Sequence, residues 1–259
     1  MSEQTQPTSA LKRTPFHERH VALGARMVDF GGWDMPVQYP TGIIAEHLAT
    51  RSGAGLFDVS HMGRFVLRGP GAVPFFQHAL TNNAEALDPL QAQYTIVPTP
   101  SGGAVDDAYL YRFVESEYLL VVNASNRVKD WEHFEEHIRG FPDVELTDET
   151  GEIAMLALQG KAARDILAGL IVAGSLPEPR RNELSEATLR VPDPDGGSPL
   201  AILTISWSRS MISNSPRRRR ATTRWKLFEP RSTAAKTLAS HPGARDRAFA
   251  ILNFVSLPR

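Results

Sequence analysis

The sequence contains no cysteine, which excludes disulfide bonds, thiolate metal ligands and a cysteine nucleophile. It also lacks an apolar run long enough for a membrane-spanning helix, and its first residues are polar without the apolar core of a secretion signal. Aromatic residues are few, at 8%, but 42% of the 259 residues are hydrophobic, so the chain can bury one large core or two small ones. We therefore expect a globular cytoplasmic protein with no membrane partner.

Charge is distributed unevenly along the chain. Residues 1–205 have 16 basic and 27 acidic side chains, a net charge of −11, whereas residues 206–259 have 12 basic and 2 acidic ones, a net charge of +10. The basic segment includes four consecutive arginines, 217–220, a cluster of the kind that binds phosphates. A nucleic-acid-binding arm is one interpretation. The segment also lacks sustained helical or strand periodicity, so we expect it to be poorly ordered.

Two adjacent carboxylates, Asp106 and Asp107, stand where a Gly-Gly turn becomes an alternating strand. Successive side chains of a strand point to opposite faces, so Asp107 should share a face with Tyr109 and Tyr111. A carboxylate among aromatic rings persists there only if it is protonated, hydrogen-bonded or facing a cationic or N–H-bearing ligand. The alternative is that both aspartates merely cap the turn.

Hydrophobic periodicity and turn residues predict an α+β fold, with helices packed against antiparallel or mixed sheets. The helix predicted over 41–51 should bury Ile44 and Leu48. The strands around 94–123 are joined by short turns, which predicts an antiparallel meander. The other predicted helices cover 15–23, 70–80, 126–139 and 160–170, and the strands cover 55–60, 64–68, 94–97, 105–114, 118–123, 144–147 and 153–158.

The predicted helix over 15–23 carries His17 and His20 on one face. Two histidines at this spacing can bind a metal, but the sequence offers no acidic or third imidazole ligand nearby. We therefore expect partly exposed helix histidines and no metal site.

Four segments, taken in order and spacing, resemble one family. They cover residues 24–36, 55–63, 102–112 and 121–126, and they are similar to the N-terminal part of the glycine-cleavage T-protein, a tetrahydrofolate-dependent aminomethyltransferase. The resemblance extends over about residues 11–205 and implies the first part of the T-protein folate-binding fold. It leaves residues 1–10 as an N-terminus that we expect to be disordered.

The resemblance implies a transferase of the glycine cleavage system, acting in glycine catabolism and one-carbon metabolism. Such an enzyme accepts an aminomethyl group from the lipoyl arm of the H-protein, passes its methylene carbon to tetrahydrofolate and releases ammonia. The implied partners are therefore the lipoylated H-protein and tetrahydrofolate as co-substrate, with no metal.

The family's motif positions imply Asp107 as the catalytic carboxylate and place Tyr94 and Asn123 beside the pterin. The residues themselves add two expected cofactor-binding contacts, Met62 at a turn and Tyr111 on the face of Asp107. Taken alone, each of these side chains is also explained by ordinary packing: tyrosines are common in sheets, Asn123 could close a strand, and methionine is a common core residue.

The similarity ends near residue 205. The family has a Thr-Gly-Tyr-Thr-Gly-Glu segment that helps form the folate site, and nothing in residues 204–216 matches it. A shifted reading frame near residue 205 explains the charge switch, the lost motif and the early stop together, whereas a nucleic-acid arm explains only the arginines. We therefore expect an incomplete folate-binding domain over 11–205, a basic tail over 206–259 and impaired transferase activity.

Two other functions stay open at this stage. Folate-binding relatives that assist iron–sulfur assembly, or that form part of dimethylglycine- and sarcosine-oxidising enzymes, share the fold. A basic-tailed nucleic-acid-binding protein is the other alternative, which a test of binding after deletion of residues 206–259 would distinguish.

Overall fold

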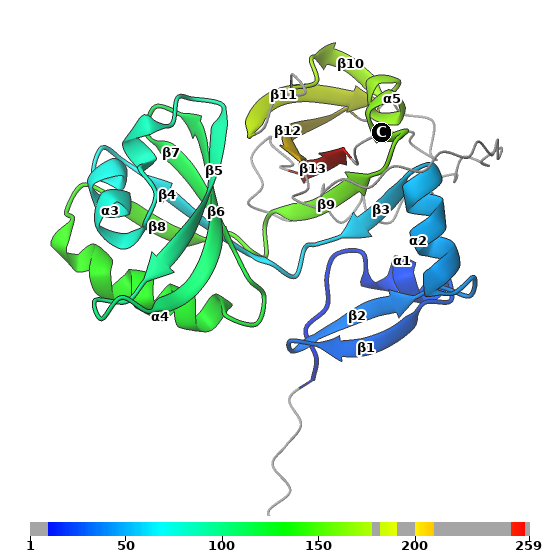
Figure 1. Ribbon diagram of the computed structural model, residues 1–259, viewed down its shortest axis with the longest axis horizontal. Helices are drawn as coiled ribbons and strands as arrows, with labels where there is room; N and C mark the ends of the chain where they lie inside the picture. Colours follow the sequence, from blue (N-terminus) through cyan, green and yellow to red (C-terminus); the bar gives the residue numbers. More distant parts are fainter. Residues whose placement is uncertain (1–9, 178–181, 191–199, 210–249, 257–259) are drawn as a thin grey trace, which may run out of the picture.

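The computed structural model describes residues 10–177, 182–190, 200–209 and 250–256, the last two ranges as backbone only (Figure 1). None of the helices in these residues is both long and apolar enough to cross a membrane. The helices are α1 (His17–Ala22), α2 (Ile43–Ser52), α3 (Ala72–Ala79), α4 (Arg127–His137) and α5 (Ala163–Ala168), with short 3-10 turns at Ala84–Ala86 and Ile138–Gly140. The strands are β1 (Arg26–Phe30), β2 (Trp33–Gln38), β3 (Gly55–Asp58), β4 (Gly63–Arg68), β5 (Gln91–Pro98), β6 (Ala104–Val114), β7 (Glu117–Val122), β8 (Glu145–Asp148), β9 (Ala154–Gln159), β10 (Ile171–Gly174), β11 (Glu183–Arg190), β12 (Leu200–Arg209) and β13 (Ala250–Ser256).

Eleven of the strands in the described residues form one mixed sheet. Its order is β3-β9-β13-β12-β11-β5-β6-β7-β4-β8, with β10 paired to β11, and β1 and β2 form a separate hairpin. All pairs in the sheet are antiparallel except those that β13 makes with β9 and β12. The predicted α+β class is confirmed, although the hairpin and strands β10 to β13 have no counterpart among the predicted strands.

The predicted meander over residues 94–123 is confirmed as β5, β6 and β7. Residue pairing places Asp107 opposite Ile96 of β5, and Ala108 opposite Val122 of β7. Helices α3 and α4 lie over one face of this part of the sheet (Figure 1), where Phe75, Phe76 and Phe134 fill the core. The opposite face of the meander packs against Ile153, Met155 and Leu184, and it carries the site described below.

Helix α2 does not bury the residues that its periodicity predicted. Ile44 is 78% exposed and Leu48 is 59% exposed, and the adjacent strand β3 also exposes Leu56 and Phe57. The prediction is wrong because periodicity shows that a helix has an apolar stripe but not which element covers it. Helix α2 contacts β2 and β3, yet Ile44 and Leu48 remain exposed among the residues that the structure describes.

His17 and His20 are buried, which corrects the expectation of partly exposed side chains. Nε2 of His17 lies 2.7 Å from Oδ2 of Asp34. His20 lies between the Tyr39 hydroxyl, 2.8 Å from Nδ1, and the Asp58 carboxylate, 3.0 Å from Nε2. These partners are 17 to 38 residues away in the sequence, so local pattern could not reveal them. The residues that the structure describes contain no group of three metal ligands.

The segment over 206–259, expected to be a poorly ordered tail, is described only in part. Residues 206–209 complete β12, and residues 250–256 form β13, which pairs with β9 and β12. The rest of that segment, and residues 1–9, lie outside the described residues.

Candidate functional site

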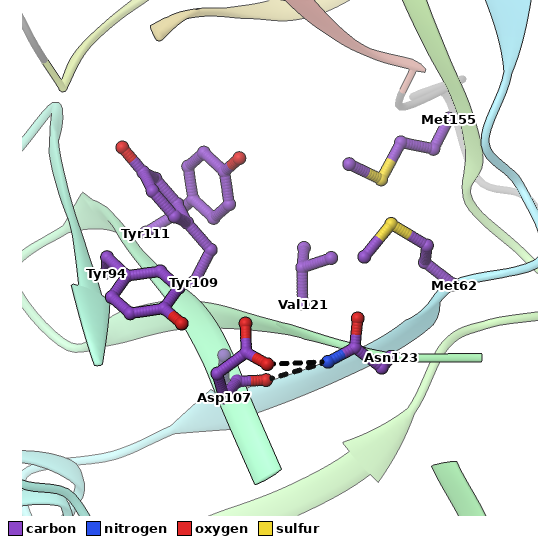
Figure 2. A pocket seen from close by; sticks show the side chains of 9 residues that line it. Met62, Tyr94, Asp107, Tyr109, Tyr111, Val121, Asn123 and Met155 are labelled. Carbon is purple, nitrogen blue, oxygen red and sulfur yellow. Dashed lines mark hydrogen bonds between the residues drawn. The ribbon is translucent and has the colours of Figure 1, made fainter. Parts of the chain in front are cut away.

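A cavity of about 220 Å³ opens on the face of the meander opposite α3 and α4. It contains all five predicted site residues, which are Met62, Tyr94, Asp107, Tyr111 and Asn123. Figure 2 shows that tyrosines form one side of the cavity and that Met62 and Met155 form the other. The complete lining is Met62, Tyr94, Asp107, Ala108, Tyr109, Tyr111, Val121, Asn123 and Met155.

Asp107 reaches the cavity because of the strand alternation of β6. It shares a face with Tyr109 and Tyr111, as the sequence predicted, while Asp106 points to the opposite face. Asn123 directly follows β7, and its side-chain nitrogen donates to Oδ1 of Asp107 at 3.1 Å (Figure 2). The Asp107 carboxylate is therefore half-buried and fixed at the edge of the cavity. Its second oxygen, Oδ2, takes no part in the hydrogen bond with Asn123.

Asn123 also links the two aspartates. The same nitrogen donates to Oδ1 of Asp106 at 3.0 Å, on the other side of β6. Because both carboxylates require a donor, the amide nitrogen faces them and the amide oxygen points away into the cavity (Figure 2). The cavity thus offers two acceptors, a carboxylate oxygen and an amide oxygen.

The tyrosine side of the cavity supplies flat apolar surface. The rings of Tyr109 and Tyr111 lie 5.0 Å apart between centroids, tilted by 50°. The Tyr109 hydroxyl donates to the side-chain oxygen of Asn182, which fixes its ring. Tyr94 is 47% exposed at the mouth, and its pKa is raised, first by burial and then by the carboxylates of Asp107 and Asp106.

Five contributing residues were missed as site residues from the sequence: Tyr109, Val121, Met155, Asn182 and Ala108. Alternation gives a signal for the first two, because Tyr109 is two residues from Asp107 and Val121 is two residues from Asn123. Met155 and Asn182 come from β9 and from the turn before β11, and no local pattern connects them to the meander.

The cavity suits a flat ring system that carries N–H groups. Aromatic and thioether side chains give stacking surface on both sides, and the two acceptors lie at one edge. Its volume of about 220 Å³ is below the range of ~300–1,000 Å³ typical of pockets that enclose a whole drug-sized ligand. The cavity formed by the described residues is therefore large enough to enclose one ring system, and the rest of a longer ligand would extend out of it.

The fold and the cavity define an α+β domain with a small site, with hydrogen-bond acceptors at one edge, on the face of the meander opposite α3 and α4. The family model described as the GCVT N-terminal domain matches residues 16–178. The chain belongs to this family. The match lies within the range of about 11–205 that the sequence resemblance covered.

Curated relatives named aminomethyltransferase are similar in sequence to this chain. The chain is 54% identical over 161 residues to the enzyme of Deinococcus deserti, covering 62% of this chain and 44% of the relative. It is 49% identical over 177 residues to the enzyme of Thermus thermophilus, covering 68% of this chain and 50% of the relative. The chain thus spans about half the length of the curated relatives it matches.

A solved structure with the same fold is the glycine cleavage system aminomethyltransferase T from Bartonella henselae. The two superpose with a TM-score of 0.60 at 35% identity, over 68% of this chain and 49% of the other. The transferase family predicted from the sequence is thereby confirmed.

Proposed function

We propose that this chain carries the tetrahydrofolate-binding side of an aminomethyltransferase site. The observation that carries the proposal is the Asp107 carboxylate, held by Asn123 at the edge of a cavity with tyrosines on one side and methionines on the other. The family match and the aminomethyltransferase relatives support it.

The residues of the cavity suit the pterin ring of tetrahydrofolate. The pterin ring is flat and rich in N–H donors, so it would lie between the tyrosine side and the methionine side, with donors toward Asp107 and the Asn123 oxygen. The aminobenzoyl-glutamate part would extend from the mouth, past the half-exposed Tyr94.

The proposed reaction moves the methylene carbon of an aminomethyl group from the lipoyl arm of the H-protein to tetrahydrofolate. The bonds of this carbon to sulfur and to the amino nitrogen break, two bonds to folate nitrogens form, the lipoyl arm is left as a thiol, and ammonia is released. Positive charge develops on the transferred carbon and nitrogen, and the Asp107 carboxylate would stabilise it. Asp107 would also hold the attacking folate nitrogen in place. Asn123 keeps that carboxylate oriented before the reaction, so little reorganisation is needed during it. We propose the lipoylated H-protein as partner and the cytoplasm as compartment.

Binding of tetrahydrofolate to the purified chain tests this proposal. Saturable quenching of tryptophan fluorescence is expected for the chain and for Asp88→Leu, in which the replaced carboxylate is exposed and makes no hydrogen bond within the part of the chain that the structure describes. In Asp107→Leu the acceptor is lost, and the affinity should fall about tenfold or more. Absence of binding to the unmodified chain, or equal affinities of the two variants, would overturn the proposal.

A further inference from the structure

A third carboxyl group lies behind the site and is not explained by it. Asp130, on α4, is 0% exposed, and neither of its side-chain oxygens receives a hydrogen bond from an N–H or O–H group in the part of the chain that the structure describes. Asp106, on β6, is 9% exposed, and its Oδ2 is likewise buried without such a donor. Three buried carboxyl oxygens are therefore left without a donor in the same place.

The two carboxyl groups are within hydrogen-bonding range of each other, across the contact between α4 and β6. Two ionised carboxylates in that position would repel and could not hydrogen bond, because neither has a donor. One proton on the pair supplies the missing donor and removes one of the two charges. A single hydrogen thereby gives a hydrogen-bond partner to two of the three oxygens.

Other charged groups near the pair do not replace that proton. Lys129, beside Asp130 on α4, uses its ammonium group on the backbone oxygen of Val105 at 2.6 Å. Asp107 adds a further negative charge from β6. Burial first, and then the Asp106 carboxylate, raise the pKa of Asp130 to about 8, while the hydrogen bonds that Asp106 receives lower its own pKa. The proton therefore belongs mainly to Asp130.

We propose that Asp130 is a positioning residue. Its protonated carboxyl group donates a hydrogen bond to Asp106 and, through Asp106 and Asn123, sets the orientation of the Asp107 carboxylate. The path is short and consists of side chains only. Oδ1 of Asp106 accepts from Asn123 at 3.0 Å, and the same nitrogen donates to Asp107 at 3.1 Å. The importance of that orientation for tetrahydrofolate rests on the proposed function, but the hydrogen-bonded path itself does not.

Loss of the shared proton changes what Asn123 faces. With Asp130 ionised, Oδ2 of Asp106 loses its donor and Asp106 gains a neighbouring negative charge, so the hydrogen bond from the Asn123 amide to Asp106 becomes stronger. The amide nitrogen is then drawn toward Asp106 and away from Asp107. The cavity should therefore exist in two states, separated by ionisation of a group that does not line it.

The side-chain amide resonances of Asn123 report this path without any ligand. In a heteronuclear NMR titration of the full chain from pH 6 to 9.5, these amide resonances should shift with a midpoint near pH 8. The Asn123→Ser variant, which lacks them, identifies them in the spectrum. In Asp130→Asn the amide group still donates to Asp106 but cannot ionise, so this shift should disappear. Glu132→Gln is the matched control, an exposed carboxylate on the same helix, and it should titrate as the unmodified chain does.

Ligand affinity measured across the same pH range gives the second readout. Tetrahydrofolate affinity of the unmodified chain should fall severalfold between pH 7 and 9.5, whereas that of Asp130→Asn should stay constant. Asp130→Val removes the donor altogether and should weaken binding at pH 7 by about tenfold, the effect of losing one hydrogen bond. A residue that only holds α4 in place would lower stability in these variants without changing the pH profile.

The outcomes separate the two proposals. If Asn123 shows no titration near pH 8, or if Asp130→Asn retains it, the role of Asp130 is refuted whether or not tetrahydrofolate binds. If the resonances titrate as described but the chain binds no tetrahydrofolate, the positioning path stands and the proposed function fails.

Discussion

Asn123 joins strands β7 and β6 through a hydrogen bond of 3.1 Å from its side-chain nitrogen to Oδ1 of Asp107. This bond links the end of β7 to β6 beside the cavity and leaves the amide oxygen facing the cavity (Figure 2). The carboxylate is thus presented in one orientation by the fold itself, before any ligand arrives.

Replacing Asp107 by asparagine should separate chemistry from binding. The amide keeps an acceptor of the same shape but has no negative charge to stabilise the developing positive charge. Turnover should therefore fall by about 100-fold or more, whereas tetrahydrofolate affinity should change severalfold at most. Ammonia release from aminomethylated H-protein measures turnover. The same assay applies to a full-length relative that carries the substitution at the matching position. Unchanged turnover would refute the role of Asp107.

Replacing Asn123 by aspartate should destabilise the chain in a pH-dependent way. A third carboxylate would stand against Asp106 and Asp107, so its pKa would be raised above that of the unfolded chain. Stability should then be lower by about 1–3 kcal/mol at pH 7 and should recover as the pH falls and the new group is protonated. Urea unfolding at pH 7 and 5 measures it. Asn83→Asp is the control, because Asn83 uses only its side-chain oxygen, which aspartate retains.

Replacing Asp58 by asparagine should reveal the contribution of its hydrogen bond with His20. Burial opposes ionisation of Asp58, but hydrogen bonds from His20 and from the backbone N–H of Ser60 outweigh it and lower its pKa. A lowered carboxyl pKa contributes stability that is present above the unfolded-state pKa and is lost as pH falls through the folded one. Asp58→Asn should cost about 2 kcal/mol at pH 7, and the deficit should narrow below pH 4. Thermal unfolding, with the exposed Asp88→Asn as control, measures both; a deficit that does not change with pH would contradict the lowered pKa of Asp58.

Asp130 should give the opposite pH dependence. Its pKa is raised to about 8, first by burial and then by Asp106, so between pH 4 and 8 the folded chain holds a proton that the unfolded chain has released. This group therefore makes stability fall with rising pH in that window, by at most about 1.4 kcal/mol per pH unit. Urea unfolding at pH 6 and 8 should show a smaller decline for Asp130→Asn than for the unmodified chain. Equal declines would show that Asp130 is ionised at pH 6.

The exposed face of α2 should tolerate polar substitution. Ile44→Gln and Leu48→Gln remove apolar groups that are already in contact with solvent, so each should change stability by no more than about 0.5 kcal/mol. Phe75→Ala, at a fully buried position of α3, should instead cost about 3–5 kcal/mol. Chemical unfolding measures all three. A large loss on α2 would show that another element covers this face in solution.

Local pattern predicted those parts of the fold whose partners are close in sequence. The meander over 94–123 follows from short turns between β-rich runs, and the shared face of Asp107, Tyr109 and Tyr111 follows from strand alternation alone. Asn123 and Tyr94 needed the family resemblance, because an asparagine after a strand and a tyrosine within one have ordinary structural explanations.

Features that depend on distant contacts were predicted incorrectly or missed. His20 is buried because Asp58, 38 residues away, accepts a hydrogen bond from it, and Met155 reaches the cavity only because β9 stands beside β3 in the large sheet. The apolar residues of α2 have the right spacing for burial, but the described residues supply no element to cover them. Periodicity carries no information about the presence of such an element.

The methionine side of the cavity has a consequence for oxidative damage. Because the chain has no thiol, oxidants that would react first with cysteine are left with its thioethers, and two of these, Met62 and Met155, face the same space. Conversion of either to the sulfoxide would put a strong dipole where an apolar ring surface is needed. If the cavity binds a pterin ring as proposed, peroxide exposure would weaken that binding, and methionine sulfoxide reductase would restore it.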